Sequence, residues 1–249
     1  MNVLVACEFS GVVRDAMIAR GYNAWSCDLL PSEGHNVHRH FQTDIRNLVD
    51  NRVMQDRGFR WQGKVYWTSY WNMLIAFPSC RYLTVSGAQW FYHPDDKDLP
   101  IEERRPHPKY PDRKEKQIES LDFVRMLMLA EIGYIAVENP VGRISTAIRK
   151  PDQIIQPYEY GHDASKRTCL WLKNLPKLQP TEFIEPRIIE EGKYAGAKRW
   201  SNQAPCGAEK TSPSTDRWMK RSRTFPGIGE AMANQWPHGP RHDFNLKGD

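Results

Sequence analysis

Residues 2–28 read NVLVACEFSGVVRDAMIARGYNAWSCD, and this stretch sets the fold class. Residues 2–7 are mostly apolar without strict alternation, which is typical of a strand buried on both faces of a sheet. Ser10-Gly11 then opens a helical pattern of apolar residues, and residues 23–28 predict a second strand. A strand, a helix and another strand in this order form the unit from which parallel sheets are built.

The alternation of strand and helix patterns continues through about the first 140 residues. This order predicts a doubly wound, mostly parallel α/β sheet. Further elements are expected along the chain: strands at residues 73–77, 134–137 and 168–172, and helices at residues 117–132 and 227–236.

The composition of the 249 residues, 40% hydrophobic and 26% charged, is that of a globular protein. No apolar run approaches the ~20 residues that cross a bilayer, and no basic segment or cleavage site precedes the first strand. Five scattered cysteines without C-x-x-C spacing predict free thiols in a reducing compartment. We therefore expect a cytoplasmic protein without a membrane partner. The net charge of +5 is compatible with a polyanion partner but does not require one.

Two predicted strands end in residues that can do chemistry. One apolar run ends in Pro78-Ser79-Cys80, and another ends in Glu138-Asn139-Pro140. A cysteine after an apolar strand is more often a small core residue than a nucleophile, and Glu-Asn-Pro is usually a turn. The presence of both motifs at adjacent strand ends favours a nucleophile and an acid that meet one ring-shaped substrate.

The first strand–helix junction has features of a cofactor site. Gly11 would let the backbone approach a ligand at a helix N-terminus, and Asp28 lies where a ribose hydroxyl is usually held. Asp44 could bind an adenine amino group, or it could cap the helical turn of residues 45–48. Glu8 is either a ligand contact or an acid of the turn.

Three histidines, His35, His38 and His40, lie close together in the sequence. Their spacing without supporting cysteines is weak for a metal site. We expect a surface cluster and no metal.

The order of these motifs resembles a known family. Glu8-Phe9-Ser10-Gly11, Asp28, Asp44-Ile45 and the two strand-end motifs occur as they do in cytosine-C5 DNA methyltransferases. Residues 223–232, RTFPGIGEAM, resemble the last motif of that family, where a C-terminal segment closes the cofactor pocket. The chain is most similar to compact, phage-type members, over roughly residues 2–175 and 216–236.

The resemblance implies a sheet of the Rossmann-like, S-adenosylmethionine-dependent methyltransferase type. It also implies S-adenosylmethionine as the cofactor, DNA as the partner, and a bacterial or phage-infected cell as the setting. The cofactor-binding residues implied in this way are Glu8, Phe9, Ser10, Gly11, Asp28, Asp44, Pro78, Gly229 and Glu230.

The catalytic roles implied by the resemblance belong to Cys80, Glu138, Asn139 and Arg167. The Cys80 thiolate would add to C6 of a flipped or unpaired cytosine, and Glu138 would hold the N3 and amino edge of the base. Asn139 would brace the loop. Exposure at a strand end and a nearby cation, Arg81 or Arg167, would favour the thiolate.

Some residues depart from the family pattern. The family usually has Pro-Pro-Cys-Gln, whereas Ser79 and Arg81 flank Cys80 here, and its Gln-x-Arg-x-Arg strand is matched only loosely by residues 165–168. Trp200 and Trp218 stand among basic residues and could stack on bases or simply pack. A long loop, residues 92–116, is expected to be functional rather than accidental.

We expect four parts: a catalytic core (1–173), a short recognition-like insertion (174–215), a C-terminal segment that returns to the core (216–240) and a tail (241–249). Full-size family members carry a large recognition domain where the insertion stands. Two alternatives therefore stay open. One is a methyltransferase acting on a modified pyrimidine, RNA or a free nucleotide, and the other is a non-catalytic nucleic-acid-binding relative.

Overall fold

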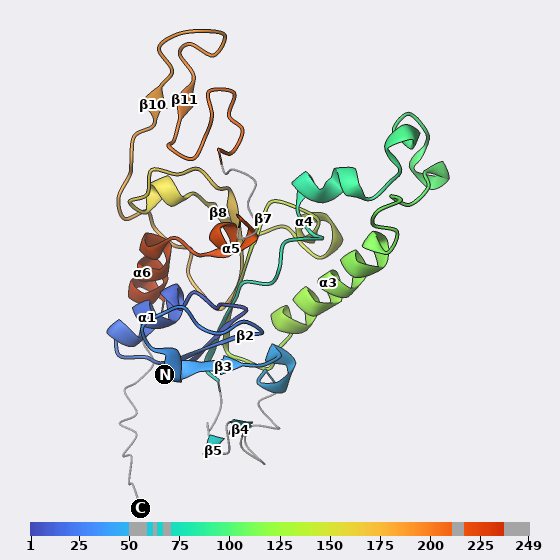
Figure 1. The fold of residues 1–249 in the computed structure, drawn as a ribbon. Coiled ribbons are helices and arrows are strands. Elements are labelled where there is room, and N and C mark those ends of the chain that lie inside the picture. Colours follow the sequence, from blue (N-terminus) through green and yellow to red (C-terminus); the bar gives the residue numbers. More distant parts are fainter. Residues whose placement is uncertain (50–58, 62–63, 67–70, 211–216, 237–249) are drawn as a thin grey trace, which may run out of the picture.

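The computed structural model describes residues 1–49, 59–61, 64–66, 71–210 and 217–236, so the expected tail (241–249) lies outside the described residues. Within them, a seven-stranded sheet has the order β3-β2-β1-β6-β7-β9-β8 (Figure 1). The parallel strands are β1 (Asn2–Ala6), β2 (Asn23–Asp28), β3 (His40–Gln42), β6 (Met73–Ala76) and β7 (Tyr134–Pro140). β9 (Thr168–Lys173) runs antiparallel between β7 and β8 (Gln153–Ile155). Two small pairs stand apart: β4 (Phe59–Trp61) with β5 (Lys64–Tyr66), and β10 (Arg187–Ile188) with β11 (Lys198–Arg199).

Helices cover both faces of the sheet. The helices are α1 (Val12–Ala19), α3 (Arg113–Met128), α4 (Ile144–Ala147), α5 (Arg217–Ser222) and α6 (Pro226–Gln235). Short 3₁₀ turns occupy Val37–Arg39, Ile45–Asn47, Val85–Trp90, Pro94–Asp96, Ile101–Glu103 and Pro157–Glu159. Val3 and Val5 of β1 pack with α1 and α6, whereas Leu4 and Ala6 belong to the core on the α3 side. Because successive side chains enter opposite cores, the strand is apolar from Val3 to Ala6.

This arrangement is the predicted doubly wound, mostly parallel sheet of the Rossmann-like type. The chain winds from β1 outward to β3 and then returns to β6 on the other side of β1. The strand order therefore reverses between the carboxyl ends of β1 and β6. Ligands of open α/β sheets bind in the crevice at such a point.

The predicted elements are present with shifted ends. α3 begins at Arg113 and ends at Met128, whereas residues 117–132 were expected to be helical, so Gly133 does not end it. The strand that contains His40 was not predicted, because its three residues are too few to show a period. His40 is buried, and its ring hydrogen-bonds Ser26 and the carbonyl of Leu30. The expectation of a surface cluster is therefore wrong for His40.

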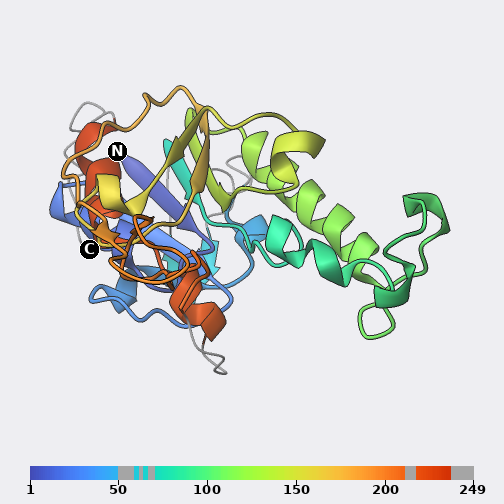
Figure 2. The same cartoon turned by 90° about the horizontal axis from the view of Figure 1, so that it is seen from above.

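Two parts project from the sheet in Figure 1, and one of them, the arm (residues 81–112), also stands clear of it in Figure 2. The arm extends away on the side opposite α6. It contains most of the long loop predicted at 92–116, and the buried Asp96 accepts hydrogen bonds from Arg105 at 2.6 to 2.9 Å. The lobe, residues 184–210, contains β10 and β11. Trp200 stacks on Tyr158 with ring centroids 4.1 Å apart, so this tryptophan packs within the protein.

The last described helix returns to the core. α6 packs against α1, and a Cβ at Gly229 would lie 3.4 Å from a methyl group of Val12. Arg223, just before α6, pairs with Glu33 in the loop after β2 at 2.8 Å. None of the helices among the described residues has the length and apolar character needed to span a membrane.

Candidate active site

The Pro78-Ser79-Cys80 loop begins beside the end of β7. β6 and β7 are parallel neighbours with Ala76 opposite Val137, so the loop leaves β6 next to Glu138. The Asn139 amide donates a hydrogen bond to the carbonyl of Pro78 at 2.8 Å, which ties the two strand ends together. The charge of Glu138 acts on the Cys80 thiol. The structure therefore brings the thiol and the carboxyl into one neighbourhood.

The start of β9 joins the same edge, because β9 runs antiparallel with Thr168 opposite Pro140. The Thr168 hydroxyl donates a hydrogen bond to the carbonyl of Lys166 at 3.0 Å. The Thr168 side chain and the Lys166 cation both act on the Glu138 carboxyl, and Lys166 also acts on Cys80. Arg167 is exposed, and its charge acts on Tyr158 and Cys169 instead.

The sequence motifs predict a catalytic role for Arg167 and do not identify Lys166. A signal was available: side chains alternate along an extended segment, so residue 166 shares the side of Thr168 and residue 167 does not. The loose match of residues 165–168 to the family's Gln-x-Arg-x-Arg strand drew attention to the arginine.

The environment of Cys80 raises the pKa of its thiol, although the residue is exposed. Desolvation by the surrounding protein is the main cause, and Glu138 adds to it, whereas Lys166 and Arg221 lower the pKa. The expectation that the surroundings favour the thiolate is therefore wrong for the free protein. The charge of Arg81, one of the two expected cations, acts on Asp112 and Arg113.

Glu138 also has a raised pKa. Burial is the largest cause, and Lys166 and Thr168 partly oppose it. Since desolvation penalises a charged carboxylate, the protonated acid is favoured relative to an exposed glutamate. The free site thus holds a neutral thiol beside a carboxyl with an increased tendency to carry its proton.

The turn between β1 and α1 uses its acid for structure. The Glu8 carboxylate accepts the amide hydrogens of Val13 at 2.6 Å and Arg14 at 3.2 Å, so it caps the first turn of α1. Burial raises the pKa of Glu8 to about 7. Of the two roles considered for Glu8, this geometry is that of the turn acid.

Gly11 has a φ of 74° at the N-cap of α1. A Cβ there would lie 2.3 Å from the guanidinium of Arg14, which is fully buried, and 3.0 Å from Gly34. The groups that approach Gly11 closely are therefore Arg14 and Gly34 of the protein itself. The hydroxyl of Ser10 is buried without a hydrogen-bond partner among the described residues.

Asp28 and Asp44 lie at or just after the ends of β2 and β3. Asp28 is half-buried, accepts the amide hydrogen of Leu30 at 2.9 Å, and has a pKa raised mainly by burial. Asp44 caps the turn Ile45–Asn47 by accepting the amide hydrogen of Arg46 at 2.9 Å. The capping role considered for Asp44 is thus present.

The remaining predicted site residues differ in exposure. Phe9 and Pro78 are buried. Gly229 is buried against the start of α1, and Glu230 is exposed, with its charge acting on His162. Gly229 therefore allows α6 to pack closely against α1. No group of three or more metal-ligating side chains occurs in the part of the chain that the structure describes.

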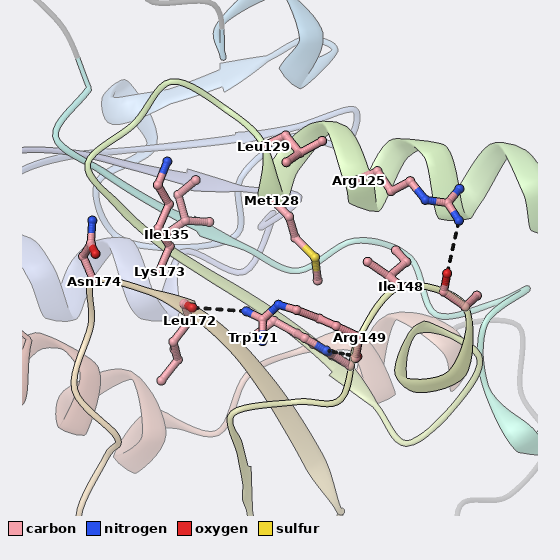
Figure 3. A pocket seen from close by; sticks show the side chains of 11 residues that line it. Arg125, Met128, Leu129, Ile135, Ile148, Arg149, Trp171, Leu172, Lys173 and Asn174 are labelled. Carbon is pink, nitrogen blue, oxygen red and sulfur yellow. Dashed lines mark hydrogen bonds between the residues drawn. The ribbon is translucent and has the colours of Figure 1, made fainter.

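A cavity of about 620 Å³ lies elsewhere, between α3, α4 and β9. Met128, Ile148 and Trp171 line it, and Arg149 donates a hydrogen bond across it to the carbonyl of Leu172 (Figure 3). Ile135 lines it from the start of β7, whereas Glu138 lies toward the end of that strand. The cavity is thus separate from the strand ends that carry Cys80.

Comparisons with known proteins add little. No family model matches the chain, and no curated protein matches it. One similar solved structure is a candidate DNA modification methyltransferase encoded within an E. coli prophage, with 13% sequence identity and a TM-score of 0.41. The match covers 74% of this chain and 52% of that one, so the chain spans about half of its length. The fold assignment rests on the strand order alone.

Proposed function

We propose that the protein is an S-adenosylmethionine-dependent methyltransferase that acts on C5 of cytosine in DNA. The observation that supports this proposal is the meeting of Cys80 and Glu138 at the carboxyl ends of two adjacent strands, tied by the hydrogen bond from Asn139 to Pro78. We place the reaction in the cytoplasm of a bacterial or phage-infected cell, where the free thiols would persist.

Cys80 supplies the nucleophile. Cytosine C5 is unreactive until the Cys80 sulfur bonds to C6, which moves an electron pair into the ring and makes C5 enamine-like. S-adenosylmethionine would supply an electrophilic methyl group, whose bond to the sulfonium sulfur breaks as C5 attacks and leaves a neutral thioether. Once C5 carries the methyl group, loss of the C5 proton returns electrons to the ring and breaks the C6–sulfur bond, which regenerates the thiolate. C5 and C6 are inaccessible to this attack within a duplex, so the base must be flipped out or unpaired.

Glu138 is suited to the edge of the same ring. N3 of cytosine accepts a hydrogen bond and its amino group donates one, so a protonated carboxyl complements both. The raised pKa of Glu138 favours that form, and a proton held toward N3 stabilises the electrons that the ring gains as sulfur adds. Lys166 stands beside both groups, and its cation opposes the cost of forming the thiolate.

The residues near the reversal of strand order fit the cofactor. Asp28 and Asp44 offer carboxylates for hydroxyl and amino groups, and the Ser10 hydroxyl has no partner among the described residues. We also assign Phe9, Gly11, Pro78, Gly229 and Glu230 to this cofactor site. Glu8 would act through the position of α1, because its oxygens are used by that helix.

The test is product analysis. The protein is incubated with DNA and S-adenosylmethionine labelled in the methyl group, and the digested nucleosides are separated. Labelled 5-methylcytosine is expected. An oligonucleotide containing 5-fluorocytosine should form a covalent complex at Cys80, because fluorine at C5 blocks the final elimination. Absence of both products from every DNA tested would contradict the proposal.

A second substrate class is favoured by the small size of the lobe. Its strands β10 and β11 have two residues each, and most of its side chains are exposed. A modified pyrimidine, RNA or free nucleotide would need less surface than a DNA sequence. If nucleotide monomers compete with DNA oligomers at comparable concentrations, this second candidate replaces the first.

A further inference from the structure

The short helix α5 is tied to the candidate active site. The Lys166 ammonium donates a hydrogen bond to the carbonyl of Arg221 at 3.2 Å, and the Arg221 cation acts on the Cys80 thiol. Just beyond the helix, Arg223 pairs with Glu33 in the loop after β2. These contacts fix the C-terminal end of α5 between the start of β9 and the carboxyl edge of the sheet.

α5 carries an exposed indole three residues before Arg221. Trp218 is 57% exposed, whereas Trp71, Trp171 and Trp236 are each 1% exposed. Residues three apart on a helix share a face, so Trp218 and Arg221 lie on the same side of α5. The indole is thus presented on the helical face that carries Arg221, one of the two cations that act on the thiol.

The charge of this segment suits a polyanion. Residues 217–223 read RWMKRSR, with four cations and no acid. Arg221 pairs with Glu209 and Arg223 with Glu33, but these side chains are 49% and 42% exposed. Such surface pairs contribute little free energy, so phosphate groups can compete for the cations.

We propose that the exposed face of α5 binds an unpaired stretch of a DNA strand, with a base stacked on Trp218 beside the site of Cys80. This inference rests on the proposed function, because α5 would bind the DNA strand from which the target base is taken. Aromatic side chains among cations are the recurring platform for single strands, since every base offers a π-face to an indole. Trp200, the other tryptophan that stands among basic residues, stacks on Tyr158 within the protein.

The experiment separates stacking from charge. Fluorescence anisotropy measures the Kd of the whole protein for a labelled oligo-deoxycytidine and for an abasic strand with the same number of phosphates. The unaltered protein should prefer the strand with bases by about ten-fold, the scale of one stacked base. Trp218→Leu should abolish this preference, and Trp218→Phe should keep most of it. Trp90→Leu is the matched control, because Trp90 is 41% exposed but lies on the arm.

An unchanged preference in Trp218→Leu overturns the inference. A second measurement needs no variant: an oligonucleotide of 5-iododeoxycytidine is irradiated with the unaltered protein and the cross-linked peptide is identified. Cross-links at Trp218 support the inference, and cross-links confined to other segments overturn it. A failure of this inference can be distinguished from a failure of the proposed function. Loss of the base preference in Trp218→Leu without methyl transfer to any DNA supports the platform alone, and methyl transfer with an unchanged preference supports the enzyme alone.

Discussion

Glu8, in the turn after β1, and Glu138, near the end of β7, lie at the same edge of one sheet, and burial raises the pKa of both carboxyls. The oxygens of Glu8 accept the amide hydrogens of Val13 and Arg14. Glu138 has instead a side-chain contact to Thr168, a nearby Lys166, and the Cys80 loop. The same residue type therefore supports a helix after β1 and remains suited to a substrate near the end of β7.

The difference comes from the element that succeeds each strand. α1 starts right after the turn of Glu8, so unpaired helix amides are available to bind the acid. No helix comes directly after Glu138, and the antiparallel β9 brings Thr168 and Lys166 to it instead. Four predictions test this contrast, in order of decreasing effect.

Cys80→Ala should lower the rate of methyl transfer by at least about a thousand-fold, because no other group can form the bond to C6. The melting temperature should stay within a degree or two of the unaltered protein, since Cys80 is exposed. Transfer of labelled methyl groups to DNA is the measurement. Cys206→Ala, the other exposed cysteine among the described residues, is the control and should keep full activity. Unchanged activity in Cys80→Ala would favour a non-catalytic, nucleic-acid-binding protein.

Glu138→Gln should lower kcat by about a hundred-fold, because an amide cannot hold a transferable proton toward N3. Stability should change little, since no helix depends on this side chain. Steady-state kinetics and thermal unfolding measured on one preparation decide the matter. A variant that unfolds but retains its kcat when folded would assign Glu138 the structural role that Glu8 has.

The folding stability should depend on pH through Glu8. Its pKa is raised from 4.5 to about 7, so the folded protein binds a proton more tightly than the unfolded chain. The stabilisation is complete below about pH 4.5 and is lost as pH rises to about 7, by roughly 3 kcal/mol for this shift. Glu8→Gln should lack this component. Urea unfolding at several pH values measures the difference, and equal slopes for both proteins would refute the raised pKa.

Lys166→Met should shift the alkylation of Cys80 to higher pH and slow it several-fold at neutral pH, because Lys166 lowers the pKa of the thiol. Mass spectrometry of Cys80 after iodoacetamide treatment measures the rate. Arg167→Met is the matched control, since its charge acts on Tyr158 and Cys169. An equal effect of both variants would mean that only the net charge matters.

Much of the fold could be predicted from local patterns. β1, β2, β6, β7 and β9 form where apolar runs predicted them, and α1 begins right after Gly11. β3 and β8 were missed, because three residues give no readable period. α3 was displaced because its first turn is charged and polar, RKEK, whereas its apolar stripe begins later.

The candidate site was predicted in its parts more than in its chemistry. The sequence pointed to Cys80 and Glu138, but it suggested a stabilised thiolate, whereas desolvation raises the pKa of the thiol. Desolvation depends on how many atoms from distant segments surround the sulfur. Lys166, just before β9, and Arg221, in α5, lower the pKa of the thiol from far along the chain, and no local pattern reveals how close they come to it.

Local sequence alone set the order of strands and helices, because apolar periodicity and glycine turns act over a few residues. It also set which strand ends carry a thiol and an acid. Tertiary structure was needed to show which acid is free for a substrate, since hydrogen bonds reach Glu8 from α1 while β9 and the Cys80 loop meet at Glu138. The hydrogen-bond partners and the burial of a side chain depend on segments that are far apart in the sequence and pack together in the fold.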